Sequence, residues 1–347
     1  MNLAEIITKT CRKFSNKIAI REDDYALTYG QLDRKTNKIS NAFRKLGIQK
    51  GDRVALYAKN SHQYIEFRLS LEKSGIVFIP INRLLSSKDV SYIMENAEVK
   101  AVVCDLDSFG TIQDIRNELS STEWIFTIDK ENAISDGERK VMSYRYINEQ
   151  FENTPLEVAS HLEDLCSINY TSGSTGKPKG VMLTQRNWLE VYKNMLIDRE
   201  IGSDERLLHI GPLTHASGSY FMPYFMRGAE NIISSKNDVV DAFFHYVEKY
   251  AITSFTCVPT MLIRIMDDPR IHTVNKDSLK TIGYGAAPMP KEQIKRAMSL
   301  FGPILVQNYG QTEAYMTVSY LSKEEHIEAL EGKEERLGSI GRPYTLV

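Results

Sequence analysis

The sequence predicts an α/β fold with mostly parallel strands covered by helices on both faces. Short apolar runs rich in valine and isoleucine alternate along the chain with longer segments in which apolar residues recur at helical spacing. Capping residues open several helical segments and glycines close them. The length of 347 residues exceeds that of an average domain, so one large domain or two interlocked domains are expected.

The first third of the chain shows the alternation most clearly. Residues 28–31 have the form of a capping box, and Gly47 stands where the helix that follows should end. A second helix is expected to end near Gly75, and a third to begin near Ser87. Strands are expected at 53–58, 77–81 and 101–104.

The middle of the chain, residues 107–162, is the least regular part. One strand is expected there, at 124–128, and the polar stretch 129–140 is expected to be a loop. Alternation returns from residue 165, and a helix is expected to begin near Lys291. The later strands are expected at 167–170, 206–210, 254–258, 281–284 and 304–307.

A glycine- and hydroxyl-rich segment, residues 170–180, directly follows one of these strands. Glycines let the backbone approach an anion closely, and hydroxyl groups and lysines supply donors and positive charge, so the segment suits a polyphosphate. A flexible linker would explain the glycines and hydroxyls but not two lysines around Pro178. The candidate phosphate-binding residues are Thr171, Ser172, Gly173, Ser174, Thr175, Gly176, Lys177 and Lys179.

The two common phosphate-loop patterns do not fit this segment. The P-loop requires a glycine, four residues and then Gly-Lys-Ser/Thr. Here Pro178 follows Gly176-Lys177, and Thr171 stands where the first glycine should be. No Gly-x-Gly-x-x-Gly sequence opens a helix here, which also excludes the dinucleotide fingerprint.

Two later strands end in unusual sequences. One leads into Gly-Ala-Ala-Pro-Met-Pro at 285–290, and the other into Asn-Tyr-Gly-Gln-Thr-Glu at 308–313. In open α/β sheets ligands bind beyond the carboxyl ends of strands, so both segments stand where a nucleotide could bind. Taken singly, the first could be a turn before a helix, and the second a helix start capped near Thr312 or Glu313. Their joint occurrence with 170–180 favours a nucleotide site.

These three segments, in this order, resemble the signature of the adenylate-forming superfamily of acyl-CoA synthetases, luciferases and peptide-synthetase adenylation domains. Further similarity, at 27–32, 51–54, 73–81, 258–261 and 337–343, extends the resemblance over essentially the whole chain. It implies the large N-terminal domain of the acyl-CoA synthetase-like fold, with two α/β lobes packed as an αβαβα sandwich. One lobe would comprise about residues 1–57 and 203–330, the other about 58–202, and 331–347 would start a truncated β-barrel.

The resemblance also implies a reaction. A carboxylate attacks the α-phosphate of ATP, giving an acyl-adenylate and pyrophosphate, and a thiol, usually that of coenzyme A, then takes the acyl group. Residues 170–180 would hold the β- and γ-phosphates, and Thr312 would donate to the α-phosphate. Glu313 and Thr175 would hold Mg²⁺. The implied catalytic residues are Thr175, Lys177, His215, Thr312 and Glu313.

The same resemblance assigns the adenine site. Tyr309 would lie against one face of the ring and the small residues after Tyr284 against the other, while Asn308 or Gln307 would read the amino group. The implied nucleotide-binding residues in this part of the chain are Gly285, Ala286, Ala287, Pro288, Gln307, Asn308, Tyr309, Gly310 and Thr312.

Residues 212–218, Pro-Leu-Thr-His-Ala-Ser-Gly, bear on the acid substrate. Amino-acid-activating relatives have an aspartate at the position of His215, and no acid occurs here between Pro212 and Glu230. A substrate ammonium group would therefore lack a partner. The pattern is similar to fatty-acyl- and aryl-CoA ligases, which implies an apolar, aromatic pocket for a fatty or aromatic acid. Its expected residues are His215, Ser217, Gly218, Tyr220, Val258, Thr260, Tyr284 and Gly285.

The chain ends at Val347, whereas members of that superfamily continue through a ribose-binding aspartate, a hinge and a small C-terminal domain with a lysine. We therefore expect the isolated chain to adenylate poorly and to form no thioester. Two alternatives stay open: an acyl-adenylate ligase that loads a carrier protein, and a nucleotide-binding protein without activity.

Composition narrows the class of partner. A net charge of −2 gives no indication of nucleic acid or a membrane surface. The sequence shows neither a signal peptide nor a membrane-spanning run. The four cysteines are far apart, without metal-ligand spacing, which is typical of buried thiols in a cytoplasmic protein. A homodimer is left open.

Overall fold

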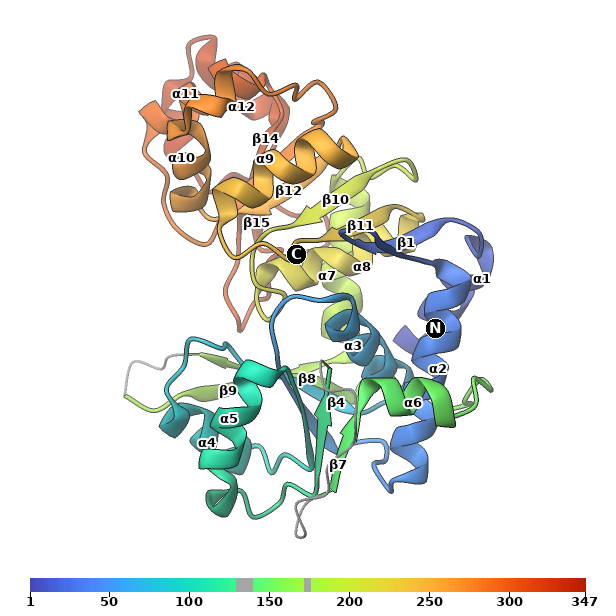
Figure 1. The fold of residues 1–347 in the computed structure, drawn as a ribbon. Helices are drawn as coiled ribbons and strands as arrows, with labels where there is room; N and C mark the ends of the chain where they lie inside the picture. The colour runs from blue at the N-terminus through green and yellow to red at the C-terminus, as the bar shows by residue number, and fades with distance from the viewer. Residues whose placement is uncertain (129–139, 172–175) are drawn as a thin grey trace. The chain divides into compact units, whose positions relative to one another are not determined.

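The computed structural model describes residues 1–128, 140–171 and 176–347, which divide into two compact units (Figure 1). Unit 1 comprises Met1–Lys17 and Leu27–Leu189, and unit 2 comprises Ile18–Ala26 and Glu190–Val347. Each unit is built on one mainly parallel sheet with helices on its faces. The predicted α/β class is confirmed.

The sheet of unit 1 has the order β7-β6-β5-β3-β4-β8-β9 among the described residues. All neighbouring pairs are parallel except β8 and β9, which form an antiparallel hairpin. The strands are β3 (Arg53–Tyr57), β4 (Val77–Pro80), β5 (Ala101–Cys104), β6 (Trp124–Thr127), β7 (Lys140–Ser143), β8 (Leu165–Thr171) and β9 (Lys179–Thr184).

Helices cover both faces of this sheet. On one face, α4 (Ser87–Asn96) and α5 (Leu106–Asp114) bury aliphatic side chains against alternate residues of β3, β4 and β5. On the other face the packing is aromatic: the Phe43 ring lies 6.2 Å from that of Phe67 and 5.4 Å from that of Phe126. The remaining helices of unit 1 are α1 (Leu3–Lys13), α2 (Tyr29–Lys45), α3 (His62–Ser74) and α6 (Tyr144–Gln150), with a short 3₁₀ helix η1 (Arg116–Glu118).

The predicted helix boundaries in unit 1 have the expected chemistry. The Thr28 hydroxyl accepts from the Gln31 backbone N–H at 3.2 Å, and the Gln31 side chain accepts from the Thr28 N–H at 2.8 Å, which completes the capping box of α2. Gly75 ends α3 with φ of +65°. These predictions are confirmed.

The sheet of unit 2 has the order β16-β15-β14-β13-β12-β10-β11-β1-β2 among the described residues. From β1 to β14 the neighbours in that order are parallel, and β15 and β16 join antiparallel at one edge. The strands are β1 (Ile18–Glu22), β2 (Tyr25–Thr28), β10 (Arg206–His209), β11 (Glu230–Ile233), β12 (Ser254–Cys257), β13 (Thr281–Gly285), β14 (Leu305–Tyr309), β15 (Ser319–Leu321) and β16 (Arg342–Pro343).

The main core of unit 2 lies on one face of its sheet. There, Phe243, Phe255, Leu262 and Ile282 belong to a cluster of buried side chains from helices and strands. Helix α8 packs against β10 and β11, and its Phe221 contacts His209, whose strand neighbour Leu208 belongs to the main core. The helices are α7 (Gln185–Asp198), which crosses the boundary between the units, α8 (Ala216–Arg227), α9 (Val239–Tyr250), α10 (Pro259–Asp267), α11 (Lys291–Phe301) and α12 (Lys323–Leu330), with 3₁₀ helices η2 (Pro269–His272) and η3 (Glu334–Gly338).

The structure differs from the sequence-based expectations at several places. The irregular region 107–162 contains most of α5 and all of β7 and α6, which were not expected. Of the predicted loop 129–140, residues 129–139 lie outside the described part, and Lys140 begins β7. After β14 the next described element is β15, so Thr312 and Glu313 cap no helix.

The residue ranges of the two units differ from those expected for the two lobes. Strand β3, at 53–57, pairs with β4 and β5 and so belongs to unit 1, not with 203–330. Residues 331–347 contribute η3 and the edge strand β16 to unit 2. Backbone pairing explains this difference, because a strand belongs to the sheet whose neighbouring strands satisfy its backbone hydrogen bonds.

Candidate functional site

The predicted phosphate-binding segment connects β8 to β9 in unit 1. Tyr170 pairs with Gly180 and Thr171 with Lys179, so the two ends of the segment are antiparallel strand partners. The predicted residues Ser172, Gly173, Ser174 and Thr175 lie outside the described residues.

The described arm of this segment presents its lysines to solvent. Gly176 has φ of +90°, a conformation that favours glycine. Lys177 and Lys179 are exposed and form no ion pair with a described residue; the Lys177 Nζ lies 5.5 Å from the centre of the Tyr92 ring on α4. A Cβ on Gly180 would lie 2.7 Å from Cγ2 of Ile168. The arm therefore carries exposed positive charge, and it packs closely against β8 at Gly180.

In unit 2 the two unusual strand ends lie side by side. Gly285 at the end of β13 is the register partner of Asn308 in β14, and Tyr284 is the partner of Gln307. A Cβ on Gly285 would lie 2.3 Å from the Asn308 carbonyl oxygen, so only glycine fits. The chain then turns at Ala286, which has φ of +64°. Beyond Gly285, the predicted residues Ala286, Ala287 and Pro288 are exposed.

Asn308 has one unused hydrogen-bonding group. Its Oδ1 accepts from the Tyr344 hydroxyl at 2.7 Å, whereas its buried Nδ2 has no hydrogen-bond partner among the described residues. The half-buried Tyr309 follows, and its hydroxyl accepts from the Gln311 amide at 3.1 Å. A buried donor without a partner is unfavourable unless a ligand satisfies it.

The rest of this segment turns sharply and exposes a carboxylate. A Cβ on Gly310 would lie 2.5 Å from the backbone of Met316, so glycine is required where the chain folds back. Thr312 is half-buried and Glu313 is exposed. Glu313 forms no ion pair with any described residue, so its carboxylate can accept a cation.

Tyr284 has a different environment from its neighbour Gly285. Its side chain is buried in the main core, and its hydroxyl lies 2.9 Å from Nε2 of His326 on α12. The His326 Nδ1 donates to the Ser322 carbonyl at 2.6 Å, so Nε2 accepts the Tyr284 proton. Burial lowers the pKa of His326, which keeps it neutral at neutral pH. The predicted pocket residue Tyr284 thus faces the core.

The segment 212–218 leads into α8. His215 is exposed at the N-cap; its N–H donates to the Pro212 carbonyl at 3.1 Å, and its carbonyl accepts from the Gly218 N–H at 3.0 Å. The buried Ser217 hydroxyl lies 3.1 Å from Nδ1 of His209, whose Nε2 lies 2.9 Å from Oδ1 of Asn231. His209 was missed from the sequence, although it stands at the end of the strand directly before this segment.

The other predicted pocket residues lie on neighbouring elements of unit 2. Gly218 and Tyr220 are buried on α8. Val258 is half-buried at the N-cap of α10, and Thr260 is exposed in its first turn. These residues belong to α8 and to the ends of β12 and β13, which register places side by side.

The described residues contain neither a candidate metal cluster nor a candidate membrane span. No group of three or more His, Cys, Asp or Glu side chains there could hold a metal ion. Within the same ranges, no helix is long and apolar enough to cross a membrane.

Comparisons with known proteins show the family of this chain. The family model described as AMP-binding enzyme matches residues 7–347. The chain is 29% identical over 342 residues to the medium/long-chain-fatty-acid–CoA ligase FadD8 of Mycobacterium tuberculosis, covering 97% of this chain and 58% of that protein. It is 30% identical over 337 residues to a feruloyl-CoA synthase of Amycolatopsis, covering 96% of this chain and 63% of that protein.

Solved structures share the fold. The anthranilate CoA ligase AuaEII in complex with anthranoyl-AMP has a TM-score of 0.89 at 20% identity, covering 99% of this chain and 65% of that one. The N-terminal domain of FACL13 from Mycobacterium tuberculosis has a TM-score of 0.88 at 25% identity, covering 99% of this chain and 82% of that one. The predicted fold of an N-terminal acyl-CoA ligase domain is confirmed.

Proposed function

Since this chain belongs to the AMP-binding enzyme family, we propose that it binds ATP and a carboxylic acid and joins them as an acyl-adenylate, with release of pyrophosphate. Coenzyme A would then accept the acyl group. The observation that carries the proposal is the pair of strand ends in unit 2, where Gly285 lets two backbones meet beside the unsatisfied Asn308 amide. Because the chain spans 58% and 63% of two curated relatives, the complete reaction is part of the proposal.

The strand ends of unit 2 suit the nucleoside of ATP. Small residues at 285–287 would leave room for a flat ring, and the Tyr309 ring would supply a stacking partner for adenine. The Asn308 Nδ2 would donate to a ring nitrogen, since Oδ1 already accepts from Tyr344. The Gln307 side chain would then accept from the amino group of adenine, and the Thr312 hydroxyl would donate to the α-phosphate.

Charge neutralisation is the main requirement of displacement at phosphorus. In unit 1, the exposed Lys177 and Lys179 would neutralise the β- and γ-phosphates together with the hydroxyls of 171–175. In unit 2, Glu313 would hold Mg²⁺ jointly with phosphate oxygens, because this ion is usually bound by one or two carboxylates and several other oxygens. Bound Mg²⁺ would supply positive charge to the phosphates. Thr175, the second expected Mg²⁺ ligand, stays a prediction.

We propose a fatty or aromatic acid as the substrate. Support comes from 212–229, where no acidic residue offers a partner to an amino acid's ammonium group, and from the apolar and aromatic character of the pocket residues. Exposed at the N-cap of α8, His215 would border the reacting carboxylate. We place the reaction in the cytoplasm, in line with four buried cysteines that form no disulfide.

The test is acid-dependent exchange of pyrophosphate into ATP, measured over a panel of fatty and aromatic acids, together with ATP binding by calorimetry. Removing one preorganised group at such a site lowers the rate by about 100-fold or more. We expect that loss for Thr175→Ala, Lys177→Ala and Glu313→Ala. Matched controls are Lys88→Ala and Glu331→Ala, which remove exposed charges elsewhere in the same units.

Three outcomes separate the candidate functions. If Glu313→Ala exchanged pyrophosphate at the wild-type rate, the Mg²⁺ assignment would be wrong. ATP binding without exchange for any acid would favour a nucleotide-binding protein without activity. If acyl-adenylate formed and the acyl group passed to a phosphopantetheine-bearing carrier protein but not to coenzyme A, the chain would be an acyl-adenylate ligase that loads a carrier.

A further inference from the structure

Arg199, directly after α7 in unit 2, has a buried guanidinium that forms no ion pair with a described residue. Its guanidinium carbon lies 5.2 Å from the centre of the Tyr220 ring. The Nε and Nη2 atoms are shielded from solvent and have no hydrogen-bond partner among the described residues. Two unsatisfied donors on a charged group are costly, and native structures normally provide partners for them.

The guanidinium lies against the sheet on the face of the proposed acid pocket. Thr256 of β12 and Gly283 of β13 are register partners. A Cβ on Gly283 would lie 2.8 Å from the Thr256 Oγ1 and 3.4 Å from the Arg199 Nη2, so glycine leaves room for the guanidinium. Gly285 lies two residues further along β13 and so on the same face. Arg199 therefore lies beside Gly283, two residues inward from Gly285, which is both an expected pocket residue and part of the proposed nucleoside site.

The groups around Arg199 do not neutralise it. Burial raises the pKa of Tyr220 and Tyr224 above the ordinary value, so both are neutral phenols at neutral pH. Burial opposes the charge of Arg199, but contact with Tyr220, Tyr344 and Tyr224 raises its pKa, so it stays protonated. The pocket thus combines a permanent positive charge with uncharged aromatic walls.

The acids of this part of unit 2 are engaged elsewhere. Glu205 is buried and accepts from the hydroxyls of Thr253 at 2.5 Å and Ser254 at 2.7 Å. Asp198, the residue before Arg199, accepts from the backbone N–H and the hydroxyl of Thr345, at 2.8 Å and 2.5 Å. No described acid therefore lies in ion-pair contact with Arg199.

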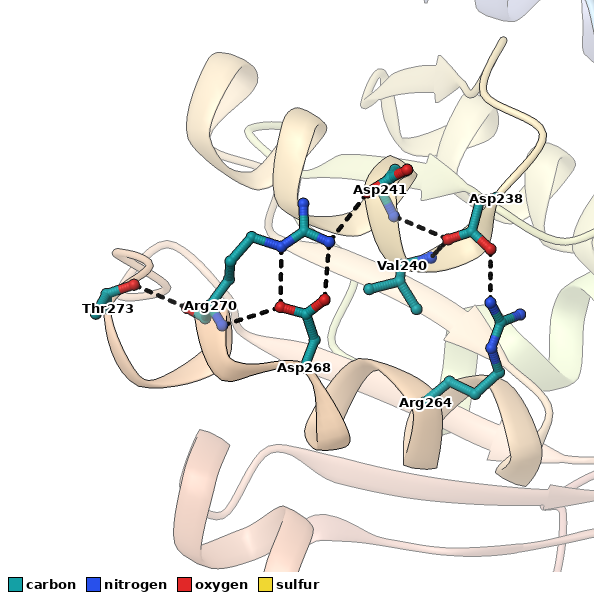
Figure 2. A network of polar contacts seen from close by, with 7 residues as sticks. All are labelled: Asp238, Val240, Asp241, Arg264, Asp268, Arg270 and Thr273. Carbon is teal, nitrogen blue, oxygen red and sulfur yellow. Dashed lines mark hydrogen bonds and ion pairs between the residues drawn. The ribbon is translucent and has the colours of Figure 1, made fainter.

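The two unsatisfied atoms of Arg199 form one edge of the guanidinium fork. The same edge of Arg270 binds a carboxylate elsewhere in this unit: its Nε lies 2.9 Å and its Nη2 2.8 Å from the two carboxylate oxygens of Asp268 (Figure 2). Paired donors of this geometry match the two oxygens of a carboxylate. The Arg199 edge is thus shaped for an anion that the described chain does not provide.

We propose that Arg199 binds a second carboxylate at the far end of the substrate, so that this enzyme activates one end of a dicarboxylic acid. The inference rests on the proposed function, which puts the nucleoside at the strand ends and the reacting carboxylate beside His215. Tyr220 would pack along the chain of the substrate, and the Arg199 edge would hold its distal carboxylate. A neutral tail in the same position would leave the guanidinium unsatisfied, which gives selectivity against monocarboxylic acids.

The test is calorimetric binding to the 347-residue chain in the presence of ATP. Succinate, adipate, suberate and terephthalate are each compared with the monocarboxylate of matching skeleton: butanoate, hexanoate, octanoate and benzoate. A bidentate charged contact should favour the dicarboxylate of at least one pair by about tenfold or more. Arg199→Met should abolish that preference, and Arg199→Lys should keep part of it. Arg296→Met, which removes a half-buried arginine paired with Asp267, should leave it unchanged.

Thermal unfolding separates this role from a structural one. Replacing an unpaired buried ion by an apolar side chain should leave the midpoint of the ligand-free chain unchanged or raise it. Preferred dicarboxylates should raise the wild-type midpoint but not that of Arg199→Met. A large fall for Arg199→Met, with its dicarboxylate preference intact, would make the arginine a structural support and overturn the proposal.

The same experiments keep the two proposals apart. If monocarboxylates bind and support pyrophosphate exchange while dicarboxylates show no preference, the Arg199 inference is wrong and the proposed function stands. If no acid of either kind binds or supports exchange, both fail.

Discussion

At Gly285 the backbone of β13 approaches that of β14 so closely that no side chain fits between them. The Cβ of an alanine there would lie 2.3 Å from the Asn308 carbonyl oxygen, and a backbone atom cannot move aside as a flexible side chain can. The proposed adenine surface depends on this approach, so the packing of one residue fixes both the stability of the strand pair and the geometry of the site.

We therefore expect Gly285→Ala to weaken ATP binding and to lower the free energy of unfolding by about 1–3 kcal/mol, the usual range for overpacking. Calorimetry and urea unfolding measure the two effects. Gly110→Ala is the control: nothing lies within 4 Å of its added Cβ in α5, and alanine favours a helix by about 1 kcal/mol. Unchanged ATP binding by Gly285→Ala would remove this residue from the site.

His326 provides a second prediction at the residue scale, because it accepts the Tyr284 proton only while it is neutral. Burial lowers its pKa below the ordinary value of 6.5, so the unfolded chain takes up the proton first as the pH falls. The contribution of His326 to stability is therefore constant above about pH 6.5 and declines below it, towards the folded-state pKa.

Urea midpoints of the wild type should accordingly fall as the pH is lowered from about 7.5 to about 5, more steeply than those of His326→Gln. The exposed His272→Gln serves as the control for loss of a histidine and should keep the wild-type slope. Equal slopes for wild type and His326→Gln would show that the imidazole is not held neutral.

At the scale of elements, a network of aspartates and arginines joins the start of α9 to α10 and η2 (Figure 2). Asp238 caps α9 through the backbone N–H groups of Val240 and Asp241 and also accepts from Arg264 at 2.5 Å. Arg270 holds Asp268 with two donors and reaches Asp241 at 3.0 Å. These contacts link α9 to α10 and to η2 in unit 2.

Acid should loosen this network. Hydrogen bonds from the Arg270 side chain lower the pKa of Asp268 from 3.8 to about 2. A depressed carboxylate pKa contributes stability above the unfolded value, and that stability is lost as the pH falls from about 4 to about 2. Asp268→Asn should remove this part of the acid dependence in thermal unfolding. The exposed Asp277→Asn, outside the network, should retain it.

An element could be predicted from the sequence when neighbouring residues determine it, and not when tertiary contacts do. The α2 capping box and the Gly75 end of α3 are contained in a few neighbouring residues, and both were predicted correctly. The pairing of β8 with β9 depends on tertiary contacts, and so does the core position of Tyr284 against His326. Arg199 belongs to no sequence motif, and its position beside the Tyr220 ring and Gly283 depends on tertiary packing.

At the scale of the whole molecule, each unit has its own sheet and its own buried core. The resemblance to a known family predicted the fold class. The boundaries of the units could not be predicted, because they depend on strand pairing that no short motif encodes. Thus β1 and β2 come early in the chain and still complete the sheet of unit 2. Stability can therefore differ between the units, and the four buried cysteines allow each unit to be observed separately.

Cys257 reports on unit 2, whereas Cys11, Cys104 and Cys166 belong to unit 1. Burial raises the pKa of Cys257 to about 12, so a thiol reagent reacts with it only after local or global opening. If unit 2 binds the nucleoside at the ends of β13 and β14, ATP should slow the labelling of Cys257. At an ATP concentration 100 times its dissociation constant the rate should fall by about 100-fold, provided that opening abolishes binding. Mass spectrometry of labelled peptides measures the rate, and Gly285→Ala should lose the protection. Equal labelling of Cys257 with and without saturating ATP would mean that the nucleotide does not stabilise this unit.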